Sequence, residues 1–254
     1  MPPEYLYGHW SVMEALRANR RQFEQLLLAE KADEKGSIGE IMHIANVRNV
    51  PIKRVPKHIL DDLSGGNNHQ STILRTNSYR YAEIDEILAV AQKRNEKPFL
   101  LMLDLLKDPQ NVGSLLRVAD VVGVHGIIMQ DRRAVAVTPA VVSASSGAVE
   151  HLLVAQVTNL VNTMKDLKKY DIWMVGFEIG EGLLPINKTN LNMGVGIVLG
   201  SEGEGMRRLV KETCDILLTL PMRGNVGSLN VSTVGAVALY NAWQAREWQG
   251  WKPL

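Results

Sequence analysis

The spacing of apolar residues changes several times in the first third of the chain, and each spacing predicts a different element. Helical spacing and short apolar runs alternate there. The predicted helices cover 8–19, 37–49 and 57–64, and the predicted strands cover 23–30 and 50–56. A loop rich in glycine and asparagine, "SGGNNHQ", then precedes another extended run. This order predicts a small α/β sandwich.

The pattern changes after residue 81. Helical periodicity continues to Pro98, and a near-continuous apolar run, "FLLMLDLL", follows. Such runs are typical of strands that are buried on both faces. Four more are "GVHGIIMQ", "YDIWMVGFE", "VGIVLG" and "CDILLTLP", with helical patterns between them. The alternation predicts an α/β fold with a mostly parallel sheet and helices on both faces, and ligands of such sheets usually bind in the loops after the strands.

Length and composition favour two domains. The chain has 254 residues, of which 46% are hydrophobic, and this is enough for one large core or two smaller ones. We expect one domain over 1–76, a polar linker over 77–82 and a second domain over 83–254. There is no apolar run of 18 residues and no charged-then-apolar leader. The sequence therefore predicts no membrane association and a cytoplasmic location.

The titratable residues exclude several kinds of site. The single cysteine, Cys214, permits no internal disulfide, and we expect it to be buried and inert. The six histidines lack the spacing that places two metal ligands on one helical face. We therefore expect no metal. A net charge of +1 argues against binding nucleic acid by bulk electrostatics, so any nucleic-acid function must depend on specific sites.

A glycine-rich turn, "GSEGEGMRR", follows a predicted buried strand. Gly200 and Gly205 have the spacing of a phosphate-binding P-loop, but Met206 replaces the lysine. A dinucleotide fingerprint fails as well, because Arg208 stands where its third glycine would be. The stretch is then either an ordinary tight turn or a loop that wraps backbone around another ligand. Glu202 can be a helix cap or a functional carboxylate. It favours the second interpretation, because the glycines on either side let another chain or a ligand approach closely.

Five letters, "NVGSL", occur at 111–115 and again at 225–229. In both places a loop is expected to lead into a helix, with asparagine ending the loop and glycine admitting a close neighbour. We expect Asn111 to cap a helix over 112–122 that carries Arg117. An arginine on a helix is usually a solvated surface residue. The polar residues after the second copy can either cap the backbone N–H groups of the following helix or face a ligand.

These stretches, in this order, resemble the SpoU (TrmH-type) family of RNA ribose 2′-O-methyltransferases in the SPOUT superfamily. The family pattern Asn-x-Gly-x-x-x-Arg matches Asn111, Gly113 and Arg117. The family's glycine loop matches 200–205, and its Ser-Leu-Asn-Val-Ser run matches 228–232. Weaker matches point to the subgroup that methylates a guanosine ribose in 23S ribosomal RNA.

The resemblance implies a fold and an assembly. Residues 83–254 are expected to form a SPOUT sheet whose C-terminal segment passes through a trefoil knot, and residues 1–76 an L30e-like domain that binds RNA. The resemblance also implies a homodimer that packs through the knotted region. The tryptophans Trp243, Trp248 and Trp251 then belong either to that interface or to the core.

The resemblance implies S-adenosylmethionine as the methyl donor. Main-chain hydrogen bonds around apolar positions are expected to hold its adenine, at Leu199, Gly200, Leu220, Met222 and Leu229.

The expected catalytic residues come from the same matches. Arg117 would hold a flanking phosphate and favour the alkoxide, because a guanidinium hardly ever loses its proton. Asn111 and Asn230 would orient the ribose or the loop. Ser228 would contact donor or substrate, and Glu202 would tie the loops together.

In the predicted RNA-binding domain, the candidate contacts are Lys53, Arg54, Arg75, His69 and Gln70. A solvated surface is the alternative for each of them alone. The family often has His-Gln-Gly in this loop, whereas a serine follows Gln70 here. Three other functions share the same core: ribose methylation of transfer RNA, resistance-type methylation of uridine or adenosine in ribosomal RNA, and RNA binding without catalysis.

Overall fold

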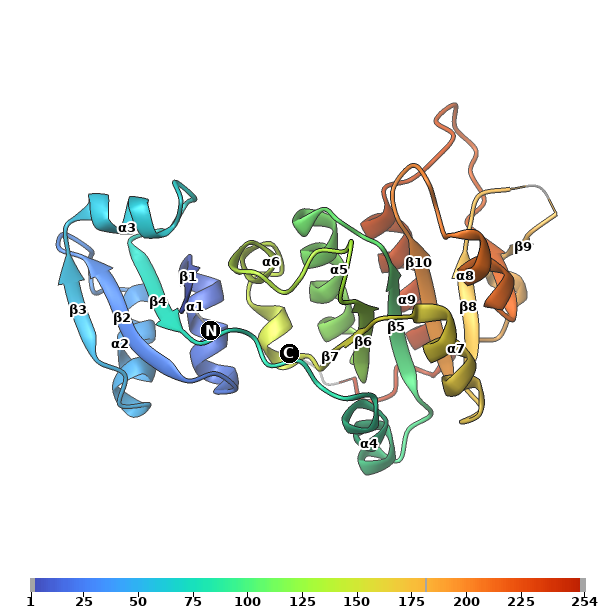
Figure 1. Cartoon of the computed structure of the whole chain (residues 1–254), viewed down its shortest axis with the longest axis horizontal. Coiled ribbons are helices and arrows are strands. Elements are labelled where there is room, and N and C mark those ends of the chain that lie inside the picture. The colour runs from blue at the N-terminus through green and yellow to red at the C-terminus, as the bar shows by residue number, and fades with distance from the viewer. Residues whose placement is uncertain (1–2, 181, 252–254) are drawn as a thin grey trace. The chain divides into compact units, whose positions relative to one another are not determined.

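The computed structural model describes residues 3–180 and 182–251, and the chain divides into two compact units. The first unit holds the chain up to Arg80 together with Val137–His151. The second holds Tyr81–Ala136 and the chain from Leu152 onward. Figure 1 colours both units along the chain from blue to red.

The first unit is built on a four-stranded mixed sheet. Its strand order is β1-β4-β2-β3, in which β1/β4 and β4/β2 are antiparallel and β2/β3 is parallel. These strands are β1 (Glu4–Tyr7), β2 (Phe23–Ala29), β3 (Ile52–Val55) and β4 (Thr72–Thr76). The helical segments are α1 (His9–Ala18), α2 (Ser37–Val47), α3 (Lys57–Leu63), α6 (Pro139–Ala144) and η1 (Ala148–His151). The predicted alternation of helices and strands over 8–64 is confirmed, whereas β1, α6 and η1 were not predicted for this unit.

A buried ion pair ties Val137–His151 to the first 80 residues. The Arg21 and Glu150 side chains are each 1% exposed and lie 2.7 Å apart at Nη2 and Oε1. Arg21 also reaches Glu4 at 2.7 Å, and its guanidinium lies 5.3 Å from the centre of the Tyr79 ring. Burial raises the pKa of Tyr79 to about 12, so this phenol stays protonated.

The second unit is built on a seven-stranded sheet in which every described pair is parallel. Its strand order is β7-β6-β5-β10-β8-β11-β9. The strands are β5 (Phe99–Asp104), β6 (Gly126–Gln130), β7 (Val154–Val157), β8 (Trp173–Phe177), β9 (Leu184–Pro185), β10 (Val195–Gly200) and β11 (Ile216–Thr219). The parallel α/β architecture predicted from the apolar runs is confirmed.

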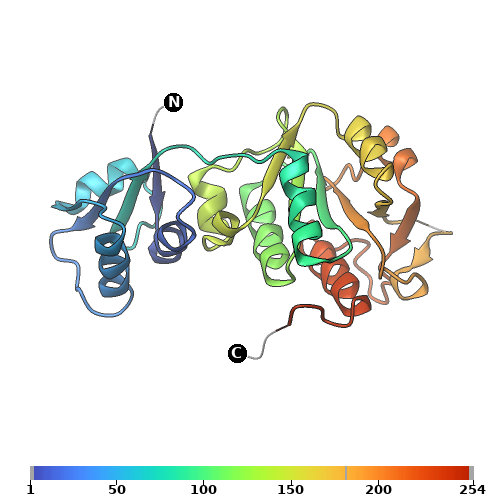
Figure 2. The ribbon, with the colours of Figure 1, turned by 90° about the horizontal axis from the view of Figure 1, so that it is seen from below.

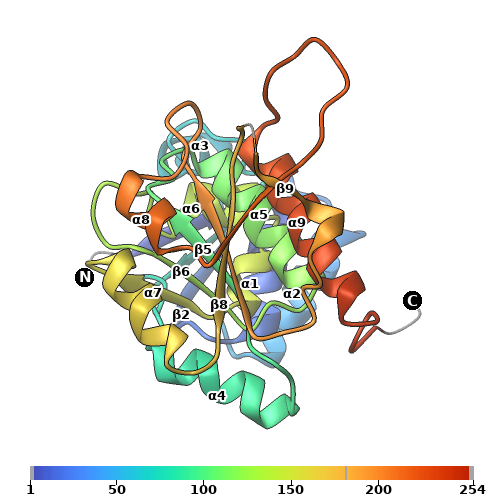
Figure 3. The same ribbon diagram turned by 90° about the vertical axis from the view of Figure 1, so that its right-hand side faces the viewer.

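Helices cover both faces of this sheet (Figure 3). One face carries α4 (Ile84–Arg94), α7 (Leu160–Lys168) and α8 (Arg208–Thr213), which share a buried core with Leu100 and Met102 of β5. The other face carries α5 (Pro109–Val121) and α9 (Val231–Ala245), which lie side by side (Figure 2). A short 3₁₀ turn, η2 (Ile186–Lys188), follows β9. Among the described residues no helix has the length and hydrophobicity to cross a membrane.

The predicted start of α5 was wrong. The helix begins at Pro109, and Asp108 is its N-cap, accepting hydrogen bonds from the backbone N–H groups of Gln110 and Asn111 at 3.2 and 3.0 Å. An aspartate followed by proline is a strong helix start, because proline is pre-organised for the first helical position. The first "NVGSL" copy therefore lies inside a helix, and Asn111 is available for other contacts.

Candidate active site

A pocket of about 450 Å³ opens where β8, β10 and β11 end. This volume is within the range of small-molecule sites, roughly 300–1,000 Å³. Its lining includes all five positions expected to hold the donor, namely Leu199, Gly200, Leu220, Met222 and Leu229. Leu199 is buried, whereas Met222 and Leu229 are 40% and 45% exposed.

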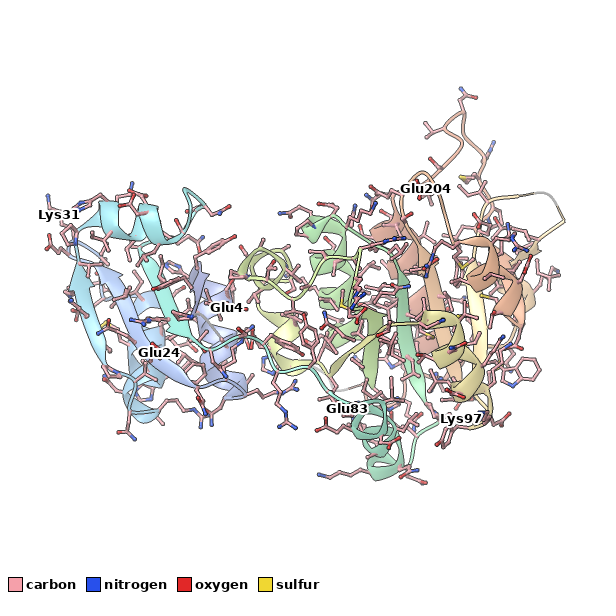
Figure 4. All side chains as sticks on the ribbon, in the orientation of Figure 1. Glu4, Glu24, Lys31, Glu83, Lys97 and Glu204 are labelled. Carbon is pink, nitrogen blue, oxygen red and sulfur yellow. The ribbon has the colours of Figure 1, made fainter. Side chains whose placement is uncertain are left out.

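The wall of the pocket after β10 is a tight hairpin. Ser201 and Gly205 exchange backbone hydrogen bonds of 3.1 and 2.9 Å. Gly200 has to be glycine here, because a Cβ atom on it would lie 2.1 Å from the backbone carbon of Gly205. Glu202 and Glu204 lie on this hairpin and line the pocket. Figure 4 labels Glu204 close to the end of β10.

A buried carboxylate holds the base of the hairpin. Asp104, at the end of β5, is 1% exposed. Its oxygens accept from the backbone N–H of Arg207 at 2.8 Å and from the guanidinium at 2.8 and 2.7 Å. Gln130 Nε2 donates to it at 3.0 Å. This clamp was not predicted from the sequence, although a carboxylate at the end of an otherwise apolar strand was the available signal.

Asn230 joins the three sequence stretches that carry the family resemblance. It is the N-cap of α9, and its Oδ1 accepts from the backbone N–H of Ser232 at 2.8 Å. Its Nδ2 donates to Asn111 Oδ1 at 2.9 Å and to Glu202 Oε1 at 2.5 Å. Three of the five expected catalytic residues therefore meet at one amide group.

The other two expected catalytic residues are Ser228 and Arg117. Ser228 lines the pocket from the exposed segment ahead of α9. Arg117 is an exposed residue of α5 and is not among the described residues that line the pocket. On α5 the neighbouring Leu115 packs instead toward α9, where a Cβ on Gly235 would lie 2.2 Å from its Cδ2 atom.

The described lining of the pocket is acidic. It includes Glu178, Glu202 and Glu204 and no lysine or arginine. Glu178 directly follows β8 and was not anticipated from the sequence. Because phosphate groups are bound by cationic side chains and backbone N–H groups, three carboxylates disfavour a nucleotide phosphate. The lining fits a ligand that is partly apolar and carries positive charge.

The expected RNA contacts of the first unit have different surroundings. His69 is 4% exposed, and its ring holds the loop by hydrogen bonds with Asp61 and with the backbone of Ser71. Gln70 is exposed, and its side-chain oxygen accepts from the N–H of His9 at 2.8 Å. Ser71 has a φ of +63°, a conformation that favours glycine, which is the residue common in the family.

The three basic candidates lie elsewhere on the same sheet. Arg54 donates to the carbonyls of Ala29 and Glu30 at 3.1 Å, and it also pairs with Glu34. Arg75 pairs with Glu24 at 2.8 Å, and Lys53 is exposed on β3.

Metal and thiol chemistry find no support in the described structure. Within residues 3–180 and 182–251, no three His, Cys, Asp or Glu side chains are grouped as a metal site requires. Cys214 is partly buried, and burial raises the pKa of its thiol to about 12, so the thiolate is scarce at neutral pH.

An all-parallel sheet with a glycine-lined pocket at the ends of its central strands defines a ligand-binding protein of the α/β class. Residues 98–240 match the SpoU rRNA Methylase family, and residues 5–82 match the RNA 2′-O ribose methyltransferase substrate-binding family. The chain therefore belongs to the SpoU/TrmH family of RNA methyltransferases.

Relatives of similar length support this assignment. A putative TrmH family tRNA/rRNA methyltransferase of Bacillus subtilis, YacO, is 41% identical over 243 residues, which is 96% of each chain. A relative with the same description from Staphylococcus saprophyticus is 41% identical over 245 residues, 96% of this chain and 97% of its own. Among solved structures, the SpoU methyltransferase AviRb from Streptomyces viridochromogenes, in complex with AdoMet, has a TM-score of 0.80 at 19% identity and covers 96% of this chain and 91% of its own.

Proposed function

We propose that this protein transfers a methyl group from S-adenosylmethionine to a ribose 2′-hydroxyl in RNA, with a guanosine of 23S ribosomal RNA as the target. The observation that carries the proposal is the pair of hydrogen bonds from Asn230 to Asn111 and Glu202 beside the pocket. They bring together residues separated by 119 and 28 positions in the chain. Such convergence is what a positioned reaction centre requires.

The pocket suits this donor. Apolar side chains such as Leu199 and Leu229 offer surface to an adenine ring, and the backbone around Gly200 offers hydrogen bonds. The carboxylates complement a ligand with net positive charge. When bound, S-adenosylmethionine supplies an electrophilic methyl group on a sulfonium.

The residues of the chain supply alignment and charge stabilisation. Asn230 fixes Glu202 and Asn111 relative to the pocket, so that the loops present one geometry to the ribose. Arg117 cannot act as a base, because a guanidinium stays protonated in proteins. Its task is to hold the phosphate beside the target ribose with two parallel hydrogen bonds and to stabilise the developing oxyanion.

The rest of the chain serves presentation of the RNA. Residues 83–254 carry the chemistry, 77–82 connect, and 1–76 bind a folded region of ribosomal RNA and present an unpaired nucleotide. A cytoplasmic homodimer packs through α9, whose exposed Val237 and Tyr240 support such an interface. In this dimer, Arg117 serves the pocket of the partner.

The deciding experiment maps 2′-O-methyl groups on ribosomal and transfer RNA after incubation with the purified protein and S-adenosylmethionine. A single new guanosine mark in 23S RNA supports the proposal. A mark only in transfer RNA, or on another nucleoside, overturns the substrate but keeps the reaction. No mark overturns the reaction. Arg117→Lys tests the mechanism: a loss of about 10²–10³-fold in turnover is expected, and near-normal turnover would refute paired hydrogen bonds.

A further inference from the structure

Glu178 is a carboxylate residue in the lining of the pocket, and it belongs to none of the three sequence stretches that carry the family resemblance. It directly follows β8, its side chain is 17% exposed, and it lines the pocket. A Cβ atom built on Gly205 would lie 3.1 and 3.2 Å from its two carboxylate oxygens. The carboxylate therefore lies close against the hairpin after β10, where the surrounding protein limits the water that can screen its charge.

The cation that pairs with Glu178, Lys211, lies outside the lining of the pocket. Lys211 Nζ of α8 lies 3.6 Å from Glu178 Oε2, and the lysine side chain is 41% exposed. This distance is too long for a direct hydrogen bond, so the lysine neutralises the carboxylate only in part. Together with Glu202 and Glu204, Glu178 gives the pocket a negative potential.

Methyl transfer changes the charge of the bound molecule. The carbon–sulfur bond breaks, its electron pair stays on sulfur, a carbon–oxygen bond forms and the hydroxyl proton leaves to solvent. S-adenosylmethionine thereby loses its sulfonium charge and becomes the neutral thioether S-adenosylhomocysteine. The two molecules have nearly the same shape, so that only charge gives the pocket a strong means of distinguishing them.

We propose that the Glu178 carboxylate makes the pocket prefer the sulfonium donor to the thioether product, an inference that rests on the proposed function. Glu178 is a specificity-determining residue: it favours donor binding and speeds product exchange, and it takes no part in bond making. One charge in a partly solvated pocket changes the affinity for a monovalent cation by about tenfold, or about 1.4 kcal/mol.

The test is calorimetric titration of the full chain, without RNA, with S-adenosylmethionine and with S-adenosylhomocysteine. Glu178→Gln should weaken donor binding about tenfold and change product binding less than about twofold. Lys211→Met should act in the opposite direction and raise the ratio of donor to product affinity. Glu212→Gln is the matched control, because it removes the same charge from α8, where Glu212 pairs with Arg208 away from the pocket. Its ratio should equal that of the wild type.

Each result decides between alternatives. Equal weakening of both ligands by Glu178→Gln would mean a hydrogen bond to a group that donor and product share, and would overturn the inference. An unchanged ratio in both Glu178→Gln and Lys211→Met would also overturn it. Where Glu178→Gln unfolds, as thermal melting would show, the Lys211→Met ratio decides alone. A wild-type protein that binds neither ligand contradicts the proposed function instead.

Discussion

Replacing Asn230 with aspartate separates the two roles of this side chain. Its Oδ1 caps α9 through the backbone N–H of Ser232, and its Nδ2 links Asn111 to Glu202. Aspartate keeps the capping oxygen, loses both donated hydrogen bonds and places a second carboxylate beside Glu202. Because aspartate is as good an N-cap as asparagine, the helix should keep its start while the link between the loops is lost.

The size of the effect follows from the two lost hydrogen bonds. The bond to the Glu202 carboxylate is charge-assisted, and exposure to water places it at the low end of such bonds, about 1.5 kcal/mol. The neutral bond to Asn111 contributes about 1 kcal/mol. We therefore expect Asn230→Asp to lower kcat/KM by about 2–3 kcal/mol of transition-state free energy, roughly 30- to 150-fold.

The assay measures transfer of labelled methyl groups to RNA across pH, together with thermal melting. The melting temperature should fall by several degrees, because the lost link also stabilises the fold, but the protein should remain folded at the assay temperature. Lowering the pH should restore part of the lost rate, because a proton shared between the adjoining carboxylates removes their repulsion. Asn159→Asp is the matched control: Asn159 caps α7 by accepting from Asn162 at 3.1 Å, and this variant should keep full activity. Normal kcat/KM for Asn230→Asp at pH 8 would refute the reasoning.

Three further predictions concern stability. Glu150→Gln should lower the free energy of unfolding by about 3–5 kcal/mol, because it leaves the buried Arg21 charge without its main partner. Urea unfolding measures this change. Recovery of the lost free energy in the double variant Arg21→Met/Glu150→Gln would identify the ion pair as the cause. Burial lowers the pKa of His125, whose Nδ1 accepts from the Phe99 N–H at 2.9 Å. The unfolded chain therefore binds a proton at this histidine more readily than the folded protein, and the free energy of unfolding should fall as the pH drops below about 6.5. His125→Asn offers an oxygen in place of Nδ1, and its free energy of unfolding should depend less on pH in urea titrations at several pH values. An equal pH dependence in the variant and the wild type would contradict this. Gly235→Ala should lower the free energy of unfolding by about 1–2 kcal/mol although alanine favours a helix more than glycine does, because the new Cβ would lie 2.2 and 2.7 Å from the buried Leu115 and Leu199 side chains. A melting temperature equal to that of the wild type would show that the two leucines can move aside to admit the methyl group.

Long apolar periodicities made most of the fold predictable. The apolar runs at β5 and β10 are long enough to predict strands that are buried on both faces, and both predictions are confirmed. Among the short strands, β3 and β11 were predicted, whereas β1, β7 and β9 were not, because two to four positions establish a period poorly. The start of α5 was misplaced because a second asparagine motif competed with the Asp108–Pro109 start.

The site was predictable only where its residues belong to motifs. The five positions expected to hold the donor line one pocket, because each of them lies at the end of a strand or in a loop after one. The clamp between Asp104 and Arg207 spans 103 positions, and no local pattern links an aspartate to an arginine at that separation. Glu178 was missed for the same reason: a single glutamate after a strand carries no spacing signal.

The assignment of Val137–His151 to the first unit means that the polypeptide crosses from one unit to the other after Arg80, after Ala136 and again after His151. Residues 1–80 alone are consequently not a complete structural unit, because Val137–His151 belong to the same unit. A chimaera that imports residues 1–80 from a relative would leave Glu150 of the host facing a foreign surface in place of Arg21. Recombination between such enzymes is expected to succeed only when the distant insert is exchanged with its counterpart.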